Sequence, residues 1–311
     1  MINCLRQEKM KSAVIRAAFM SCWSYSIFRD NAQAIQNREF EEMKTIVRQR
    51  MKISVGSMFT AVIALIIGLG APAGANADEA DAKRLLKAMS DYMTEQKAIS
   101  FAFDATLEVV TKDNQKLALA SSGTVILNRP DKIRATRAGG HAGVEMLFDG
   151  KMLTLFNEYP NLYSQIDVPG SVDHLIDELK DKHNKPLPAA DLIMSNVYDQ
   201  LMLDVVDVKD LGSGVIDGVE CDYLAFRKKE VDWQIWIAQG DHPYPCRYVI
   251  TSKLIAHSPQ YSIQFRDWKT GNRVASDNFR FKNSTTAKKV DLKDLRGMSE
   301  LPDHFKRGGT Q

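Results

Sequence analysis

The segment Cys221–Ile255 constrains the fold more than any other part of this chain. It contains three short runs rich in Val, Ile, Tyr, Trp and Phe, and the connectors RKKE and AQGDHPYP carry the charges, Gly and Pro that are typical of turns. Side chains alternate between the two faces of a strand, so one face of the middle run carries Val231, Trp233, Ile235 and Ile237. The segment therefore predicts three antiparallel strands with one strongly apolar face.

The same alternation recurs along most of the chain. Turn signals such as Asn128-Arg129-Pro130-Asp131 and Asp149-Gly150 separate the runs. Roughly a dozen antiparallel strands with short links curl rather than lie flat. We therefore expect a mainly β (α+β) fold, built as a strongly curved antiparallel sheet or open β-barrel. Besides the three strands above, strands are expected at 99–109, 116–127, 132–137, 144–148, 152–156, 162–166, 203–209, 261–268 and 274–281, with a short hairpin arm at 212–218.

Three segments have helical periodicity instead. The segment 78–98 is amphipathic and is expected to pack across the sheet as an N-terminal helix. Two further helices, 172–180 with Ser171 as its N-cap and 189–203, form a helical insertion at 171–203. We expect this insertion to act as a lid or plug over the concave face, although ordinary core packing would produce the same pattern. Its apolar candidates are Leu175, Ile176, Leu192, Ile193, Met194 and Val197.

Residues 51–77 have the organisation of a secretory signal peptide. Lys52 supplies the positive start, residues 59–69 the apolar core, and Ala75-Asn76-Ala77 a cleavage site before Asp78. The apolar core is shorter than the ~20 residues that a membrane span needs. No Cys follows it as a lipobox, so we expect a soluble protein in the periplasm of a Gram-negative bacterium, without a stable membrane span after cleavage between Ala77 and Asp78.

The fifty residues before this signal are unexpected. Met51 is a natural start, which makes residues 1–50 an over-called or disordered extension, and a cytoplasmic extension on an uncleaved anchor is the alternative. The expected organisation is an extension at 1–50, a signal peptide at 51–77, a curved-sheet domain at 78–283 with its helical insertion, and a polar tail at 284–311.

Composition and motifs exclude several classes of function. The part of the chain after the signal is mildly acidic, which argues against nucleic acid because duplex binding needs a basic face. The six His are scattered, and the chain has no G-x-S-x-G, H-E-x-x-H or P-loop motif. We therefore expect no enzyme activity, no metal site and no cofactor.

Cys221 and Cys246 are the two cysteines that follow the signal peptide. An oxidising compartment favours a disulfide between them. A geometric objection stands, because strands on either side of a third strand lie roughly 9–10 Å apart, beyond disulfide reach. The two prolines before Cys246 leave open a loop that folds over.

Several short sequence motifs resemble those of a family of predicted periplasmic proteins of unknown function, related to the LolA/LolB-like lipoprotein-carrier superfamily. They are DAKRLLKAMSDYM (81–93), GVECDYLAFR (218–227), VDWQIWI (231–237), PYPCRYVITSK (243–253) and PQYSIQFRDW (259–268). The resemblance implies an unclosed β-barrel with a helical lid and an apolar cavity that binds acyl chains. This chain departs from the carriers in two respects: it lacks a lipobox, and no residue matches their lid-latching arginine.

Together these observations predict a periplasmic binding or carrier protein for a lipid or lipoprotein acyl chain. The alternative is an envelope interaction or scaffold module with a packed core, whose partner would be another envelope protein. The candidate cavity residues are apolar and mostly aromatic: Phe101, Phe103, Phe148, Phe156, Trp233, Ile235, Tyr248, Tyr261 and Phe265.

Overall fold

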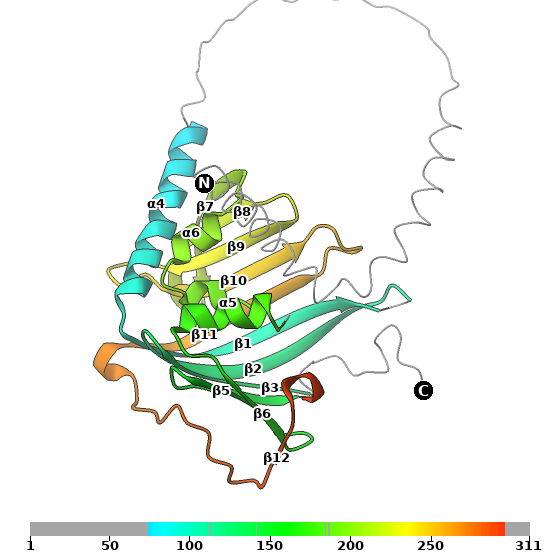
Figure 1. The fold of residues 1–311 in the computed structure, drawn as a ribbon. Helices are drawn as coiled ribbons and strands as arrows, with labels where there is room; N and C mark the ends of the chain where they lie inside the picture. Colours follow the sequence, from blue (N-terminus) through cyan, green and yellow to red (C-terminus); the bar gives the residue numbers. More distant parts are fainter. Residues whose placement is uncertain (1–73, 112, 141, 184, 186, 296–311) are drawn as a thin grey trace, which may run out of the picture.

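The computed structural model describes residues 74–111, 113–140, 142–183, 185 and 187–295. Within them the chain forms one open sheet of twelve strands, which curves around the helices on its concave side (Figure 1). The prediction of a mainly β fold with a strongly curved, unclosed sheet is confirmed. No helix among these residues is long and apolar enough to cross a membrane.

Two antiparallel meanders make up the sheet. The first is β1 (Ala98–Val110), β2 (Lys116–Asn128), β3 (Lys132–Gly139), β4 (Gly143–Phe148), β5 (Met152–Asn157) and β6 (Leu162–Asp167). The second is β7 (Asp207–Ile216), β8 (Val219–Arg227), β9 (Val231–Ala238), β10 (Pro245–Ser252) and β11 (Gln260–Thr270). The pairing of β1 with β11 joins them, so the strand order is β12-β6-β5-β4-β3-β2-β1-β11-β10-β9-β8-β7.

The helices lie on the concave side. Helix α4 (Gly74–Glu95) packs against β7, β9 and α6, and its side chains Ala82, Leu86, Met89 and Met93 are fully buried, as their helical spacing predicts. Helix α5 (Val172–Asp181) begins at Ser171, whose hydroxyl accepts a hydrogen bond from the backbone N–H of His174, so the predicted N-cap is confirmed.

The second inserted helix is not continuous, and the prediction of one helix over 189–203 is wrong. The segment splits into the 3₁₀-helix η1 (Ala190–Ile193) and the short helix α6 (Val197–Met202). Ala189 has a left-handed φ of 57°, and Met194 is extended. The backbone N–H of Ser195 donates to the carboxylate of Asp173 instead of closing a helical turn.

Two strand predictions are also corrected. The expected strand at 203–209 and the hairpin arm after it are a single strand, β7, which accommodates Gly212 (φ 81°) at a bulge between Asp210 and Ser213. The expected strand at 274–281 does not form, because both edges of β11 are already occupied by β1 and β10. A 3₁₀-turn, η2 (Gly271–Arg273), ends β11 instead.

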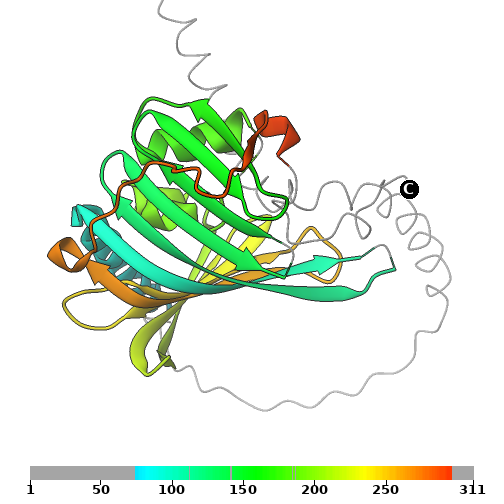
Figure 2. The ribbon, with the colours of Figure 1, turned by 90° about the horizontal axis from the view of Figure 1, so that it is seen from below.

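Residues 274–287 form an irregular segment that we call the strap. It crosses the outer face of the first meander and ends in β12 (Lys288–Lys289), which pairs with β6 and precedes η3 (Leu292–Asp294) (Figure 2). An ion pair of 3.1 Å joins Asp277 to Arg134, and the ring of Phe281 lies 4.9 Å from that of Tyr163. The strap therefore covers apolar side chains that point away from the helices.

Some predictions concern residues outside this description. The extension 1–50, residues 51–73 of the expected signal peptide and the end of the expected tail lie outside the described residues, and the expected cleavage bond between Ala77 and Asp78 falls within α4. The domain boundaries stay predictions.

The sheet contains a glycine whose position tests this register. A Cβ on Gly123 in β2 would lie 2.0 Å from the carbonyl oxygen of Thr136 and 2.6 Å from the ring of Phe103. We therefore expect Gly123→Ala to lower the free energy of unfolding by about 3 kcal/mol, because overpacking forces backbone shifts. Urea denaturation of the variant checks this. Gly140→Ala is the matched control, since no described atom lies within 4 Å of its Cβ, and equal stability of the two variants would contradict the register.

Candidate functional site

The concave face of the sheet brings most of the predicted cavity residues together. Side chains from β1, β4, β9, β10 and β11 belong to one hydrophobic cluster, in which Tyr261 is half-buried and the others are less than 9% exposed. Ring contacts connect them, with Phe101 edge-on to Phe265 at 5.2 Å and Trp233 edge-on to Tyr248 at 5.8 Å. We call this surface the wall; its predicted members are Phe101, Phe103, Phe148, Trp233, Ile235, Tyr248, Tyr261 and Phe265.

Phe156 is not part of the wall. Leu153 and Leu155 of β5 point into the core cluster, so Phe156 points to the opposite face, where its ring lies 5.6 Å from that of Phe281 on the strap. The expectation that Phe156 lines the concavity is therefore corrected. Both faces of β5 are therefore covered, which explains why its sequence carries apolar residues on both sides.

The described residues of 171–203, which we call the plug, fill the hollow that the wall surrounds. Apolar side chains from α5, η1 and α6 are all less than 9% exposed and belong to the same cluster as the wall. The structure thus places all six predicted lid residues against the wall, namely Leu175, Ile176, Leu192, Ile193, Met194 and Val197.

A few polar contacts fasten the plug to the surrounding elements. Arg129, in the turn between β2 and β3, donates from Nη2 to the carbonyl oxygen of Met194 at 3.3 Å. Ser90 of α4 accepts from the backbone N–H of Tyr198 at 3.0 Å, and Thr94 donates to the carbonyl oxygen of Ser195 at 3.3 Å. Sequence reasoning missed these residues, because Arg in a turn and Ser or Thr on a helix are ordinary surface residues until the plug is in place.

A carboxyl group lies inside this interface. The hydroxyl of Tyr248 on the wall donates to Oδ2 of Asp191 on η1 at 3.4 Å. Burial raises the pKa of Asp191, and burial together with this neighbouring carboxylate raises the pKa of Tyr248 well above its usual value. Burial also lowers the pKa of Lys228, in the turn between β8 and β9, against the attraction of Asp191. These groups meet where the plug approaches the wall.

Four polar side-chain atoms near the plug and the wall have no hydrogen-bond partner among the described residues. They are Oδ1 of Asp191, Nε1 of Trp233, Nε of Arg129 and Nε1 of Trp268. Buried polar atoms are usually paired, because an unmet donor or acceptor costs about 1–3 kcal/mol. The interface is therefore less complete in its polar contacts than in its apolar ones.

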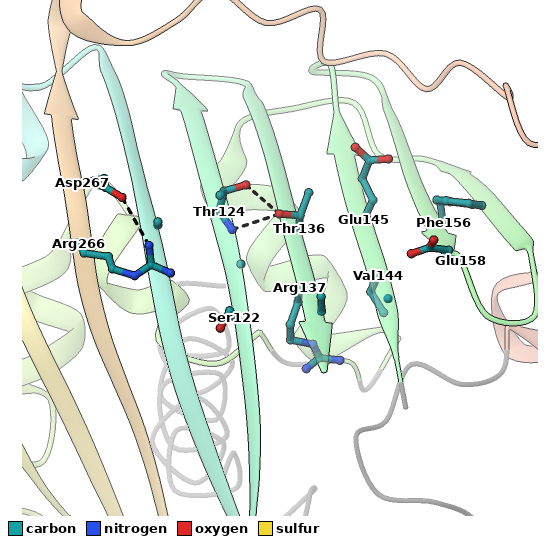
Figure 3. A pocket seen from close by; sticks show the side chains of 14 residues that line it. Ser122, Thr124, Thr136, Arg137, Val144, Glu145, Phe156, Glu158, Arg266 and Asp267 are labelled. Atoms are coloured by element: carbon teal, nitrogen blue, oxygen red, sulfur yellow. Dashed lines mark hydrogen bonds and ion pairs between the residues drawn. The ribbon is translucent and has the colours of Figure 1, made fainter. Parts of the chain in front are cut away.

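A separate groove lies on the outer face, over β11 and β1 to β5 (Figure 3). Its volume is about 650 Å³, and most of its lining side chains are polar or charged. Several of these groups are paired: Arg266 Nε lies 2.8 Å from Oδ2 of Asp104, which lies outside the lining, and the hydroxyls of Thr124 and Thr136 are 2.8 Å apart. The groove faces away from the plug and shares none of the wall's predicted residues.

The predicted disulfide does not form. Cys221 on β8 and Cys246 at the β10 bulge are both free and buried, and both contact Ala238 on β9, the strand between them. Burial raises the pKa of both thiols. The pair therefore belongs to a small apolar cluster, in which the bulge at Cys246 brings the two thiols close enough to interact without forming a disulfide.

The burial of the Asp191 carboxyl predicts how the stability of the fold depends on pH. Because its pKa in the folded state lies above the unfolded value, its neutral form stabilises the fold in acid, and that stability is lost as the pH rises through the folded pKa. Asp191→Asn removes this dependence. The variant should gain stability over the wild type by about 1.4 kcal/mol per pH unit between the two pKa values.

Urea denaturation at a series of pH values from acid to neutral measures this difference. Asp199→Asn is the control, since Asp199 is exposed on α6 of the same plug. A constant difference between the Asp191→Asn variant and the wild type at every pH would contradict the burial of an ionisable carboxyl.

Comparison with known proteins places the chain in a family. The model of the family described as "Predicted periplasmic protein (DUF2092)" matches residues 82–293, which run from α4 to η3. A search of curated proteins finds no match.

Solved structures with a similar arrangement have low sequence identity. The lipoprotein LppX of Mycobacterium tuberculosis is 14% identical, with a TM-score of 0.33 over 63% of this chain and 100% of that chain. A chain of the Pseudomonas aeruginosa MucA/MucB complex is 12% identical, with a TM-score of 0.37 over 65% of this chain and 61% of that chain. A LolA superfamily protein of Nitrosomonas europaea is 11% identical, with a TM-score of 0.28 over 61% and 94%.

The family match covers the same region as the sequence words that carried the resemblance, from the initial helix to β11. The resemblance predicted from those words is thereby confirmed. The chain belongs to the DUF2092 family of predicted periplasmic proteins.

Proposed function

We propose that the protein binds a lipid or a lipoprotein acyl chain in the hollow of its curved sheet and carries it through the periplasm. The observation that supports this proposal is the way the plug closes the hollow. The hollow is lined by strands but closed by a separate segment that adds no strand to the sheet. The plug can therefore leave the wall without breaking any β-ladder hydrogen bond.

An acyl chain is a suitable replacement for the plug. The plug meets the wall with Leu, Ile, Met and Val side chains, and the wall meets it with aromatic rings. Methylene groups of an acyl chain bury the same kind of surface, worth ~0.8 kcal/mol each. A chain of roughly 16 carbons offers ~12 kcal/mol before the cost of moving the plug and ordering the ligand. Exchange of one apolar partner for another keeps that cost moderate.

The closed packing of the hollow favours a second candidate. Seven of the eight wall residues and all six named plug residues are less than 9% exposed, so the hollow is full in this conformation. A permanently packed core would make the protein an interaction module of the cell envelope, with its binding surface on the outside. The two candidates differ in whether the plug moves.

Binding of uncharged amphiphiles with one head group and increasing chain length separates the candidates. We expect monoacylglycerols of 8, 10 and 12 carbons, titrated calorimetrically below their critical micelle concentrations, to bind more tightly with length. The gain should be about fourfold per added methylene, which corresponds to ~0.8 kcal/mol.

Phe156→Ala on the outer face is the control for this titration, because its ring contacts the strap and not the plug. It should leave the dependence on chain length unchanged. Failure of all three lipids to bind, or equal affinities at all lengths, would favour the packed interaction module.

Loosening the plug should make binding easier. Arg129→Ala removes the donor to the carbonyl oxygen of Met194 and should cost about 1–3 kcal/mol of stability. Because the plug then leaves the wall more readily, lipid association measured by stopped flow should be faster. Arg134→Ala is the matched control, since Arg134 pairs with Glu145 and Asp277 on the outer face. Equal effects of the two substitutions on the association rate would argue against a moving plug.

A further inference from the structure

Two of the unpartnered atoms between plug and wall require opposite hydrogen-bond partners. The indole Nε1–H of Trp233 is a donor only and needs an acceptor. Oδ1 of Asp191 is an acceptor when the carboxyl is ionised and can also donate when it is protonated. A single small group that both donates and accepts satisfies both side chains.

Tyr248 places these two side chains in one neighbourhood. Its hydroxyl donates to Oδ2 of Asp191, and its ring meets the ring of Trp233 edge-on at 5.8 Å. The Trp233 ring is fixed from its other side, since it stacks on Phe226 at 3.9 Å with an interplanar angle of 6°. Asp191 comes from η1 of the plug, and Trp233 and Tyr248 come from β9 and β10 of the wall.

Negative groups outnumber positive ones around this point. Lys228 is attracted by both Asp191 and Asp204, so one cation faces two carboxylates. Burial and Asp191 raise the pKa of Tyr248 well above its usual value, so its hydroxyl keeps its proton. An anionic head group would therefore meet an excess of negative charge.

We propose that the plug and the wall together bind an uncharged hydrogen-bonding head group, a hydroxyl or an amide, at the end of the apolar chain in the hollow. This inference rests on the proposed function. Trp233 donates to the head group, Asp191 binds it from the opposite side, and Tyr248 orients the Asp191 carboxyl. The 3₁₀-helix η1 with Asp191 stays at the wall, and the methylene chain continues along the aromatic wall, in the space that the apolar side chains of α5 and α6 occupy in this structure.

Ionic head groups fit this position poorly. A carboxylate or a phosphate accepts from Trp233 but leaves Asp191 without a donor and adds a negative charge beside it. A trimethylammonium group has no N–H for Asp191 and no acceptor for Trp233, so both side chains stay without a hydrogen bond. The site therefore selects against cationic heads by hydrogen bonding, and against anionic heads by hydrogen bonding and charge.

Three lipids with the same 12-carbon acyl chain and different heads test the proposal. The probes are monolauroylglycerol, laurate and lauroylcholine, titrated calorimetrically against the wild-type protein below their critical micelle concentrations. We expect monolauroylglycerol to bind at least about tenfold more tightly than either ionic lipid, because an ionic head leaves a buried polar atom of the site without its hydrogen bond.

Two substitutions at Asp191 should change this preference in different ways. Asp191→Leu removes both carboxyl oxygens and should weaken monolauroylglycerol binding by about tenfold. Asp191→Asn keeps a donor and an acceptor but loses the negative charge, so laurate should bind more tightly while monolauroylglycerol is unaffected. Asp199→Leu and Asp199→Asn, on the exposed side of the same plug, should change neither affinity. If Asp191→Leu fails to fold, the laurate affinity of Asp191→Asn still tests the proposal. Tighter binding of laurate to this variant than to the wild type supports the site, and equal binding overturns it.

The outcomes distinguish this inference from the proposed function. If no lipid binds and chain length has no effect, the proposed function fails, and this inference fails with it. If affinity rises with chain length but the three heads bind equally, and the Asp191 variants behave like the wild type, the carrier function stands and the head-group site is overturned. Tighter binding of laurate than of monolauroylglycerol to the wild type would also overturn it.

Discussion

The pairing of β1 with β11 is the contact on which the rest of the structure depends. These strands come from opposite ends of the described chain, and their register runs from Leu107 opposite Tyr261 to Ile99 opposite Thr270. Without it the two meanders would be separate sheets with no common concave face. A bulge in β11 near Asp267, which has φ 56°, allows Trp268 to stack on Phe101 at 5.0 Å. The same pairing that joins the meanders therefore also positions the aromatic wall.

Apolar side chains pack the resulting hollow closely, but some buried polar atoms there have no hydrogen-bond partner among the described residues. Wall and plug form one continuous core, yet polar atoms at their boundary lack partners within the described chain. A segment selected only to fill a core would carry Leu or Ile where Asp191 lies, because an apolar side chain of similar size avoids the desolvation of a carboxyl. The polar residues at this boundary thus cost stability that apolar residues would not.

The strands could be predicted from the sequence because alternation is a local property. Long-range arrangement decided the points at which prediction was wrong. Residues 274–281 alternate as a strand should, but β11 has no free edge to receive them. Phe156 belonged to an apolar run, yet the strap, which folds from the far end of the chain, covers that face.

The candidate site divides in the same way. Its apolar part was visible in the sequence, because aromatic residues at alternate positions indicate a buried face. Its polar part was not, because a lone Asp in a helical segment or an Arg beside a turn has the composition of a solvated surface. Asp191 and Arg129 acquire their surroundings only when the plug folds onto the wall, from elements distant in the sequence.

An open sheet, unlike a closed one, keeps two edges whose backbone groups can recruit strands from other molecules. This protein treats its two edges differently. At one end the short β12 covers part of β6, so a neighbour would meet an irregular segment. At the other end β7 carries the bulge at Gly212, which interrupts the regular spacing that a second copy needs for pairing. The irregularities at the two ends of the sheet thus act against aggregation and let a sheet of this length remain unclosed.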